Sequence, residues 1–257
     1  MSSDNEWAGK TYWIVGASSG LGEALARDLS ALGASLILSA RNETALFKLA
    51  ADLPHKTQVV ECDVSKTLSV ERAFKQVVKE RPIDGIIFCA GIYKPMRAQK
   101  WDAETVENIC NVNFVGAARI LGVCIPHLID QGRGHVALIG SLAGLRGIPA
   151  ATAYGASKAG LIHMAENLKA DLPPEKFKIQ VINPGFIKTR LTDQNAFKMP
   201  FIMDVEEAAT RTRKALESKR FETNYPTRFA IMFKILGLLP NCLYFPIVRK
   251  FLSTKPK

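Results

Sequence analysis

Short apolar runs alternate with longer amphipathic stretches along most of this chain. The first run, "TYWIV" at 11–15, precedes "EALARDLSALG" at 23–33, where Gly33 is placed to end a helix. Further strands are predicted at 35–38, 58–61 and 84–88, and further helices at 43–53 and 68–80. Continuous apolar strands separated by helices predict a parallel sheet that is covered on both faces.

The second half of the chain repeats this pattern with longer helices. We expect a helix over 103–129, a strand at 134–140, a helix from about Thr152 to Leu172, a strand at 178–183 and a seventh strand within 220–226. Residues 186–205 are predicted to form a substrate loop or lid, because their isolated apolar residues follow no clear period. The pattern therefore predicts one α/β domain over 1–257, a doubly wound Rossmann fold with about seven parallel strands.

Composition agrees with a globular protein. The 257 residues are 47% hydrophobic, enough for a sizeable core without disulfides. The five cysteines are odd in number and scattered, without a C-x-x-C pair, so we expect reduced thiols and no metal site. The N-terminus is acidic and has no apolar stretch before the first strand, from which we expect a cytoplasmic protein.

The net charge of +10 is concentrated near the C-terminus, where eleven basic and two acidic residues follow Thr210. Within the extension 227–257, the longest uncharged run, Ile235 to Val248, is 14 residues and shorter than a membrane-spanning helix. Two alternatives remain for this basic, apolar segment. It lies at an anionic membrane surface, or it covers the substrate pocket or packs on a neighbouring subunit. Both indicate an apolar substrate, and the absence of a recognisable binding module argues against nucleic acid.

A glycine-rich loop follows the first strand. "GASSGLG" places Gly16, Gly20 and Gly22 where the backbone must turn sharply and approach a pyrophosphate closely. Ser18 and Ser19 can donate hydrogen bonds at the positive end of the helix. By itself the loop is equally compatible with an ordinary strand-to-helix turn.

The residue after the second strand indicates the type of dinucleotide. Proteins that prefer NAD usually place an acidic side chain here against the ribose 2′-hydroxyl, whereas this chain has Arg41. An arginine can pair with a 2′-phosphate, which predicts NADP(H) over NAD(H); the alternative is a solvated arginine at the head of a helix. Asp63 is placed to reach the adenine edge or to cap the following helix.

One tyrosine and one lysine stand four residues apart in "AYGASKAG". On a helix, Tyr154 and Lys158 share a face. A free phenol has a pKa near 10, and a nearby ammonium, helped by a positively charged nicotinamide, is expected to lower it. Such a tyrosine can exchange a proton with a carbonyl or alcohol oxygen during hydride transfer.

With their neighbours these residues resemble the short-chain dehydrogenase/reductase superfamily, from about Tyr12 to Pro226. The glycine loop is similar to T-G-x-x-x-G-x-G, and "YGASK" to Y-x-x-x-K. "GSLAG" supplies Ser141 thirteen residues before Tyr154, "NVNFVG" supplies Asn113, and "NPGFIKT" resembles the P-G segment after the sixth strand. The departures are Val15, where the family often has threonine, and Cys89, which replaces the asparagine of N-A-G; we expect altered bracing and unchanged chemistry.

The resemblance implies a role for each matching residue. Tyr154 would be the general acid/base, and Lys158 would lower its pKa and hold the nicotinamide ribose. Ser141 would hydrogen-bond the substrate oxygen, and Asn113 would support a water that relays protons through Lys158. The cofactor contacts expected are Gly16, Ser18, Ser19, Gly20, Leu21, Gly22, Arg41, Asp63, Val64, Ala90, Gly91, Tyr154, Lys158, Pro184, Gly185, Ile187 and Thr189.

These observations predict an NADP(H)-dependent oxidoreductase that interconverts a carbonyl and a secondary alcohol on a lipophilic substrate. Two alternatives stay open at this point. One is a non-catalytic NADP-binding sensor or membrane-associated scaffold, and the other is an epimerase or dehydratase that uses the cofactor without net turnover. The resemblance also implies a homo-oligomer, a dimer or a tetramer, with subunits pairing through the two long helices.

Overall fold

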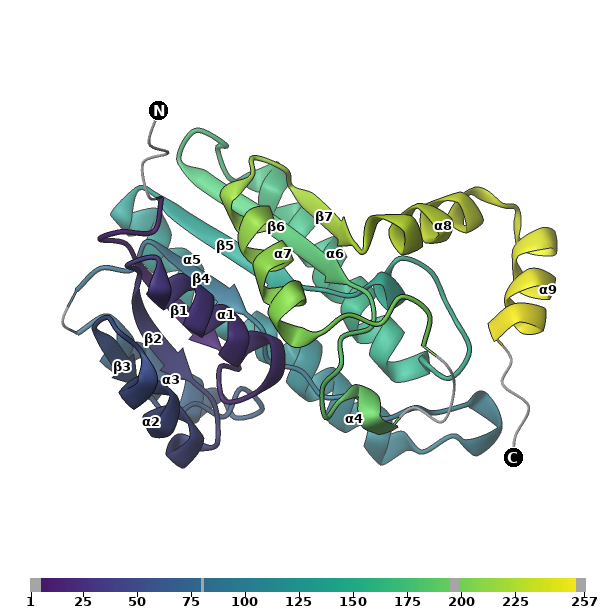
Figure 1. Ribbon diagram of the computed structural model, residues 1–257, viewed down its shortest axis with the longest axis horizontal. Coiled ribbons are helices and arrows are strands. Elements are labelled where there is room, and N and C mark those ends of the chain that lie inside the picture. Colours follow the sequence, from purple (N-terminus) through teal and green to yellow (C-terminus); the bar gives the residue numbers. More distant parts are fainter. Residues whose placement is uncertain (1–5, 80, 195–198, 253–257) are drawn as a thin grey trace.

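Seven parallel strands form the centre of the molecule (Figure 1). The computed structural model describes residues 6–79, 81–194 and 199–252. The strand order is β3-β2-β1-β4-β5-β6-β7. The strands are β1 (Thr11–Val15), β2 (Ser35–Ser39), β3 (Thr57–Val59), β4 (Gly85–Phe88), β5 (Gly134–Ile139), β6 (Phe177–Pro184) and β7 (Glu222–Tyr225). The predicted fold class, a doubly wound α/β sheet, is confirmed.

Helices cover both faces of this sheet. They are α1 (Gly20–Ala31), α2 (Glu43–Asp52), α3 (Thr67–Val77), α4 (Ala103–Cys110), α5 (Gly116–Gln131), α6 (Thr152–Asp171), α7 (Val205–Glu217), α8 (Thr227–Leu238) and α9 (Asn241–Leu252). Side chains of α1, α2 and α7 pack in one core, and those of α3, α5 and α6 pack in the other.

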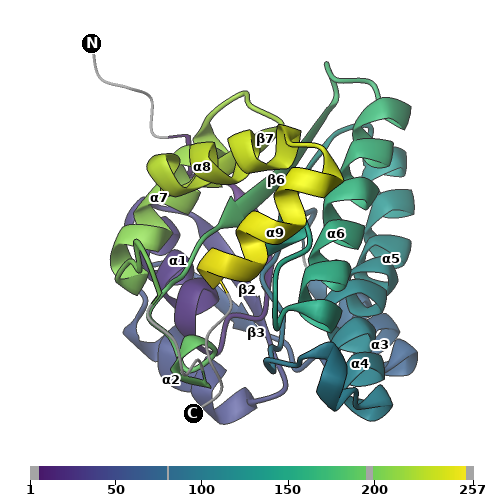
Figure 2. The same cartoon turned by 90° about the vertical axis from the view of Figure 1, so that its right-hand side faces the viewer.

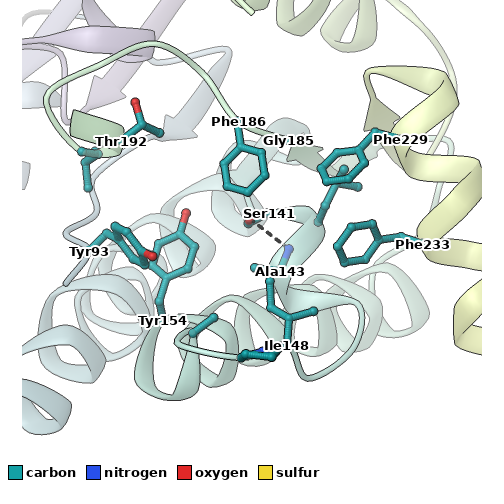
Figure 3. A pocket seen from close by; sticks show the side chains of 14 residues that line it. Tyr93, Ser141, Ala143, Ile148, Tyr154, Gly185, Phe186, Thr192, Phe229 and Phe233 are labelled. Carbon is teal, nitrogen blue, oxygen red and sulfur yellow. Dashed lines mark hydrogen bonds between the residues drawn. The ribbon is translucent and has the colours of Figure 1, made fainter. Parts of the chain in front are cut away.

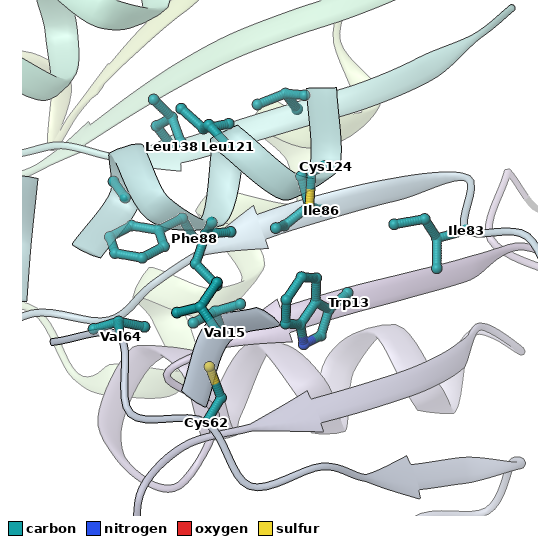
Figure 4. Packing of buried hydrophobic residues seen from close by; sticks show 14 of the residues in the cluster. Trp13, Val15, Cys62, Val64, Ile83, Ile86, Phe88, Leu121, Cys124 and Leu138 are labelled. Atoms are coloured by element: carbon teal, nitrogen blue, oxygen red, sulfur yellow. The ribbon is translucent and has the colours of Figure 1, made fainter. Parts of the chain in front are cut away.

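Alternate residues of the strands enter the two cores, as the period of a β-strand requires. Trp13 and Val15 of β1 pack beneath α3 and α5 (Figure 4), whereas Tyr12 and Ile14 of the same strand face α1 and α7. The indole N–H of Trp13 is hydrogen-bonded inside this core, because Trp13 Nε1 donates to Ser39 Oγ at 2.8 Å. Burial on both faces explains why the strands are continuously apolar.

The long helix predicted over 103–129 is interrupted. Between α4 and α5, residues Asn111–Val115 form a π-helical turn, which a hydrophobic pattern does not reveal. Within the described part of the chain, the helical stretch Ala103–Gln131 is the one long and apolar enough to cross a bilayer. Its buried residues, including Ile120 and Leu128, belong to the core against the sheet. It is therefore a core helix.

Two segments differ from or extend the sequence prediction. Helix α7 was not predicted, because its buried stripe consists mainly of small residues such as Ala208 and Ala215, which give a weak hydrophobic period. In the predicted lid 186–205, Ile187 and Met203 form a β-bridge, and residues 195–198 lie outside the described residues.

The C-terminal extension forms α8 and α9, which lie at the end of the molecule to which β7 points (Figures 1 and 2).

Candidate active site

A cleft of about 1450 Å³ lies where the order of the strands reverses, because β1 pairs with β2 on one side and with β4 on the other. Open α/β sheets bind ligands at such a switch point, beyond the carboxyl ends of the strands. All predicted cofactor contacts line this one cleft, namely Gly16, Ser18, Ser19, Gly20, Leu21, Gly22, Arg41, Asp63, Val64, Ala90, Gly91, Tyr154, Lys158, Pro184, Gly185, Ile187 and Thr189.

The glycine loop is shaped by contacts that exclude side chains. Gly16 has a φ of +94°, and a Cβ there would lie 2.5 Å from the backbone nitrogen of Ala90. A Cβ on Gly22 would collide with the carbonyl oxygen of Gly16. Both positions therefore require glycine, since the loop passes directly against the end of β4.

The start of α1 fits an anionic ligand. Its N-cap residue, Ser19, is extended and makes no side-chain capping hydrogen bond, so the first N–H groups of the helix have no side-chain partner from the cap. Ser18 and Ser19 both line the cleft. Free N–H groups at the positive end of a helix, beside a loop without Cβ atoms, suit the pyrophosphate of a dinucleotide.

The end of the cleft near α2 carries Arg41 together with the acidic side chains of Glu43, Glu61 and Asp63. The exposed Arg41 lies directly before the N-cap of α2, Asn42. Asp63 accepts hydrogen bonds from the backbone and hydroxyl of Ser65 at 3.0 and 2.7 Å. Burial opposes ionisation of Asp63, but these hydrogen bonds lower its pKa overall. Asp63 thus closes a turn before α3 and does not cap that helix, whose N-cap is Lys66.

Tyr154 and Lys158 lie one turn apart on α6, as predicted, and both line the cleft. Lys158 Nζ is 5.8 Å from the centre of the Tyr154 ring. The same nitrogen donates a hydrogen bond of 2.7 Å to the carbonyl of Ile139, at the end of β5. Both side chains are therefore held against the sheet by the first two turns of α6.

In the chain by itself, the pKa of Tyr154 does not shift in the direction expected beside Lys158 and a positively charged nicotinamide. Burial raises the pKa of the Tyr154 phenol, although its hydrogen bond with Ser141 acts in the opposite direction. Burial also lowers the pKa of Lys158 to about 8, with Cys89 acting weakly against this shift. Desolvation penalises the charged form of each group, and at Tyr154 it outweighs the hydrogen bond with Ser141. Tyr154 is thus a protonated phenol at neutral pH.

Ser141 is positioned by a residue that sequence analysis did not identify. The backbone N–H of Ser141 donates to Asn183 Oδ1 at 3.1 Å, and Asn183 Nδ2 donates to Asn224 Oδ1 at 2.8 Å. The amide of Asn183 passes so close to Gly140 that a Cβ there would collide with it. The ends of β5, β6 and β7 therefore fix the serine beside Tyr154.

Asn113 is fully buried within the π-helical turn and does not line the cleft. Its Oδ1 accepts from the N–H of Ile92 at 2.8 Å, and its Nδ2 donates to the carbonyl of Ile92 at 2.9 Å and to Ser157 Oγ at 3.1 Å. The side chain thus fastens the segment after β4 to α6. Its predicted support of a water relay stays a prediction.

Cys89 lines the cleft, but burial raises the pKa of its thiol to about 12 despite the nearby Lys158. A neutral thiol is a poor nucleophile. The substitution in the family's N-A-G segment therefore places an unreactive small side chain at this position. Among the described residues, no group of three His, Cys, Asp or Glu side chains is arranged to hold a metal ion.

An apolar pocket adjoins the cleft and shares Ser141 and Tyr154 with it (Figure 3). None of the described residues lining this pocket is charged. Sequence analysis did not identify Tyr93, Leu142 or Ile148 of its wall, whereas Phe186 belongs to the predicted substrate loop 186–205 and Phe229 and Phe233 belong to the C-terminal extension. In the sequence, Phe229 and Phe233 of α8 could be recognised only as part of an apolar C-terminal segment. One of the alternatives predicted for that segment was that it covers the substrate pocket.

Comparisons with known proteins agree with this geometry. A sequence profile described as short chain dehydrogenase matches residues 10–199. An oxidoreductase of Myxococcus xanthus is 32% identical over 249 residues, covering 95% of this chain and 98% of the relative. A short-chain dehydrogenase from Sphingobium yanoikuyae in complex with NADPH has a TM-score of 0.80 at 22% identity, covering 96% of this chain and 97% of its own. An enzyme from Burkholderia phymatum in complex with NAD has a TM-score of 0.81 at 21% identity, covering 98% of both chains.

Proposed function

Because the chain belongs to the short-chain dehydrogenase/reductase family and is an oxidoreductase of that family, we propose that it reduces a carbonyl group on a lipophilic substrate with NADPH. The observation that carries the proposal is the junction of the cleft and the apolar pocket at Ser141 and Tyr154. When bound in the cleft, the nicotinamide cofactor supplies the hydride. Ser141 and Tyr154 lie where the oxygen of a substrate in the pocket would meet them.

The protonation states of the site favour reduction. Burial raises the pKa of Tyr154, so its phenol carries a proton that it can donate to a developing alkoxide. Ser141 Oγ accepts a hydrogen bond from the N–H of Ala143 at 3.1 Å, and its own proton can serve either the Tyr154 phenol or the substrate oxygen. Burial lowers the pKa of Lys158 to about 8, so its ammonium can release a proton near neutral pH to restore the phenol.

The pocket supports a neutral, apolar substrate. Phe229 and Phe233 meet edge to face, with ring centres 4.9 Å apart, and Phe186 lies 5.8 Å from Phe229. With no charged side chain among the described lining residues, a carboxylate or phosphate in this pocket would lose its hydration without a partner. Aliphatic and aromatic ketones or aldehydes fit this environment.

A carbonyl panel tests the activity. With NADPH, kcat/KM for a series of alkyl ketones is expected to rise about fourfold per added methylene until the pocket is filled, whereas charged 2-oxo acids react slowly. Oxidised cofactor and alcohol should form in equal amounts, which distinguishes net reduction from epimerase or dehydratase chemistry. Absence of turnover across the panel, with NADPH still bound, would favour the non-catalytic sensor.

Arg41 is proposed to select NADPH over NADH by pairing with the 2′-phosphate of NADPH. The change Arg41→Asp is expected to lower the ratio of kcat/KM for NADPH over NADH by about 10–100-fold, the effect of one lost charge-assisted hydrogen bond plus repulsion. Arg190→Gln, at another exposed arginine that lines the cleft, serves as the matched control. A ratio that is unchanged in Arg41→Asp would contradict the assignment.

A further inference from the structure

Helix α8 is apolar on two opposite faces. Phe229, Ala230 and Phe233 are buried, and the two phenylalanines line the substrate pocket. On the other side Ile235 and Leu238 are 60% and 86% exposed. A helix at the surface of a soluble protein normally turns polar residues outward, so the core does not account for the outer face of α8.

Helix α9 extends this apolar surface and is firmly attached. Its Tyr244 is buried and donates a hydrogen bond of 2.9 Å to the carbonyl of Gly147. The guanidinium of Arg146 lies 3.8 Å from the centre of the Tyr244 ring and donates to the carbonyl of Leu239 at 2.9 Å. The adjoining Leu243 and Phe245 are nevertheless exposed. They belong to a structured helix and are not side chains of a loose tail.

Exposed apolar side chains are concentrated on these two helices. We define the α8–α9 face as Ile231, Met232, Ile235, Leu238, Leu243 and Phe245. They are six of the fourteen large hydrophobic side chains exposed on the described residues. Figures 1 and 2 show both helices together at one end of the molecule. Such a cluster marks a binding surface, whereas single exposed hydrophobic residues do not.

The charged side chains of α8 and α9 are all of one sign. No aspartate or glutamate follows Glu222 in the sequence. The described cations Arg228, Lys234, Arg249 and Lys250 are all exposed on α8 and α9. Lys234 lies 3.7 Å from Glu222, the last acidic residue. Apolar side chains flanked by cations, on two helices that carry no acidic residue, match the interface of a membrane that contains anionic lipid.

We infer that the α8–α9 face docks on an anionic phospholipid bilayer. Covering the pocket and binding a membrane were alternatives at the sequence level, but they use opposite faces of α8 and are compatible. Docking would also place the substrate pocket near the bilayer, because Phe229 and Phe233 on the inner side of the same helix line that pocket. The binding itself does not depend on the proposed reduction, since no turnover is required.

Flotation of the full chain with vesicles tests this inference. The protein is expected to float with vesicles of phosphatidylcholine and phosphatidylglycerol and much less with phosphatidylcholine alone. The double change Ile235→Asp, Leu238→Asp should lower the vesicle-bound fraction at least tenfold. The double change Phe47→Asp, Leu68→Asp alters residues of similar exposure, 57% and 64%, on α2 and α3 and should leave it unchanged. Arg249→Gln with Lys250→Gln, which removes two exposed cations, should weaken binding roughly thirtyfold, at about 1 kcal/mol for each cation.

Two results would overturn the inference. One is equal flotation of the wild type and the Ile235→Asp, Leu238→Asp variant. The other is a wild type that does not float with vesicles and is a dimer by light scattering, while the Ile235→Asp, Leu238→Asp variant is a monomer. That result would make the α8–α9 face a subunit contact. Thermal unfolding of each variant checks that it is folded. NADPH binding, measured separately, distinguishes failure of this inference from failure of the proposed function.

Discussion

Replacing Tyr154 with phenylalanine is expected to lower kcat/KM for carbonyl reduction about 10²–10⁴-fold, the usual contribution of a positioned general acid. The change removes only the hydroxyl, and the ring keeps its edge-to-face contact with Tyr93, at 5.0 Å between ring centres. The affinity for NADPH should change little, because the phenol hydroxyl is only one of many predicted cofactor contacts along the cleft. Steady-state kinetics on the best ketone of the panel, together with cofactor titration, measures both quantities.

Tyr93→Phe is the matched control for this experiment. Tyr93 also lines the pocket, and burial raises the pKa of its phenol to about 12, but it is not on α6 beside Lys158. We expect its loss to reduce kcat/KM less than tenfold. If both variants lost activity to the same extent, the effect would come from pocket polarity, and Tyr154 would not be the specific proton donor.

Lys158→Met is expected to lower kcat/KM about 10²–10³-fold and, at the same time, to stabilise the fold. Burial lowers the pKa of Lys158 from 10.5 to about 8, so an ammonium at pH 7 destabilises the folded chain. Methionine removes that cost but also the hydrogen bond to Ile139. The net gain in the free energy of unfolding is expected to be about 2 kcal/mol at pH 7.

The difference in stability between the wild type and Lys158→Met is expected to depend on pH. Below pH 8 both the folded and the unfolded wild type hold the proton, and the full cost is present. Between pH 8 and 10.5 the folded chain loses the proton first, so wild-type stability rises relative to Lys158→Met and the difference in Tm narrows. Lys176→Met, at an exposed lysine, should show no such trend. A variant that is less stable than the wild type at pH 7 would contradict the argument.

The sequence alone was sufficient for the local features of the site. The spacing of Tyr154 and Lys158 places them on one helical face, and the apolar strand pattern predicts the doubly wound sheet. Because the carboxyl ends of parallel strands share one edge, the motifs that follow β1, β2, β4 and β6 necessarily meet. The cofactor contacts predicted from those motifs accordingly line one cleft.

Properties that depend on burial or on distant contacts were decided only by the tertiary structure. In the chain by itself the pKa of Tyr154 is raised, because desolvation outweighs the hydrogen bond with Ser141. Asn183 braces Ser141 from a strand about forty residues away in the sequence, and neither side chain signals this contact locally. Phe229 and Phe233 become pocket walls only because α8 packs across the end of the sheet. The periodicity of apolar residues indicates which face of a helix or strand is buried. It does not indicate which element covers that face or how far water is excluded from the resulting site.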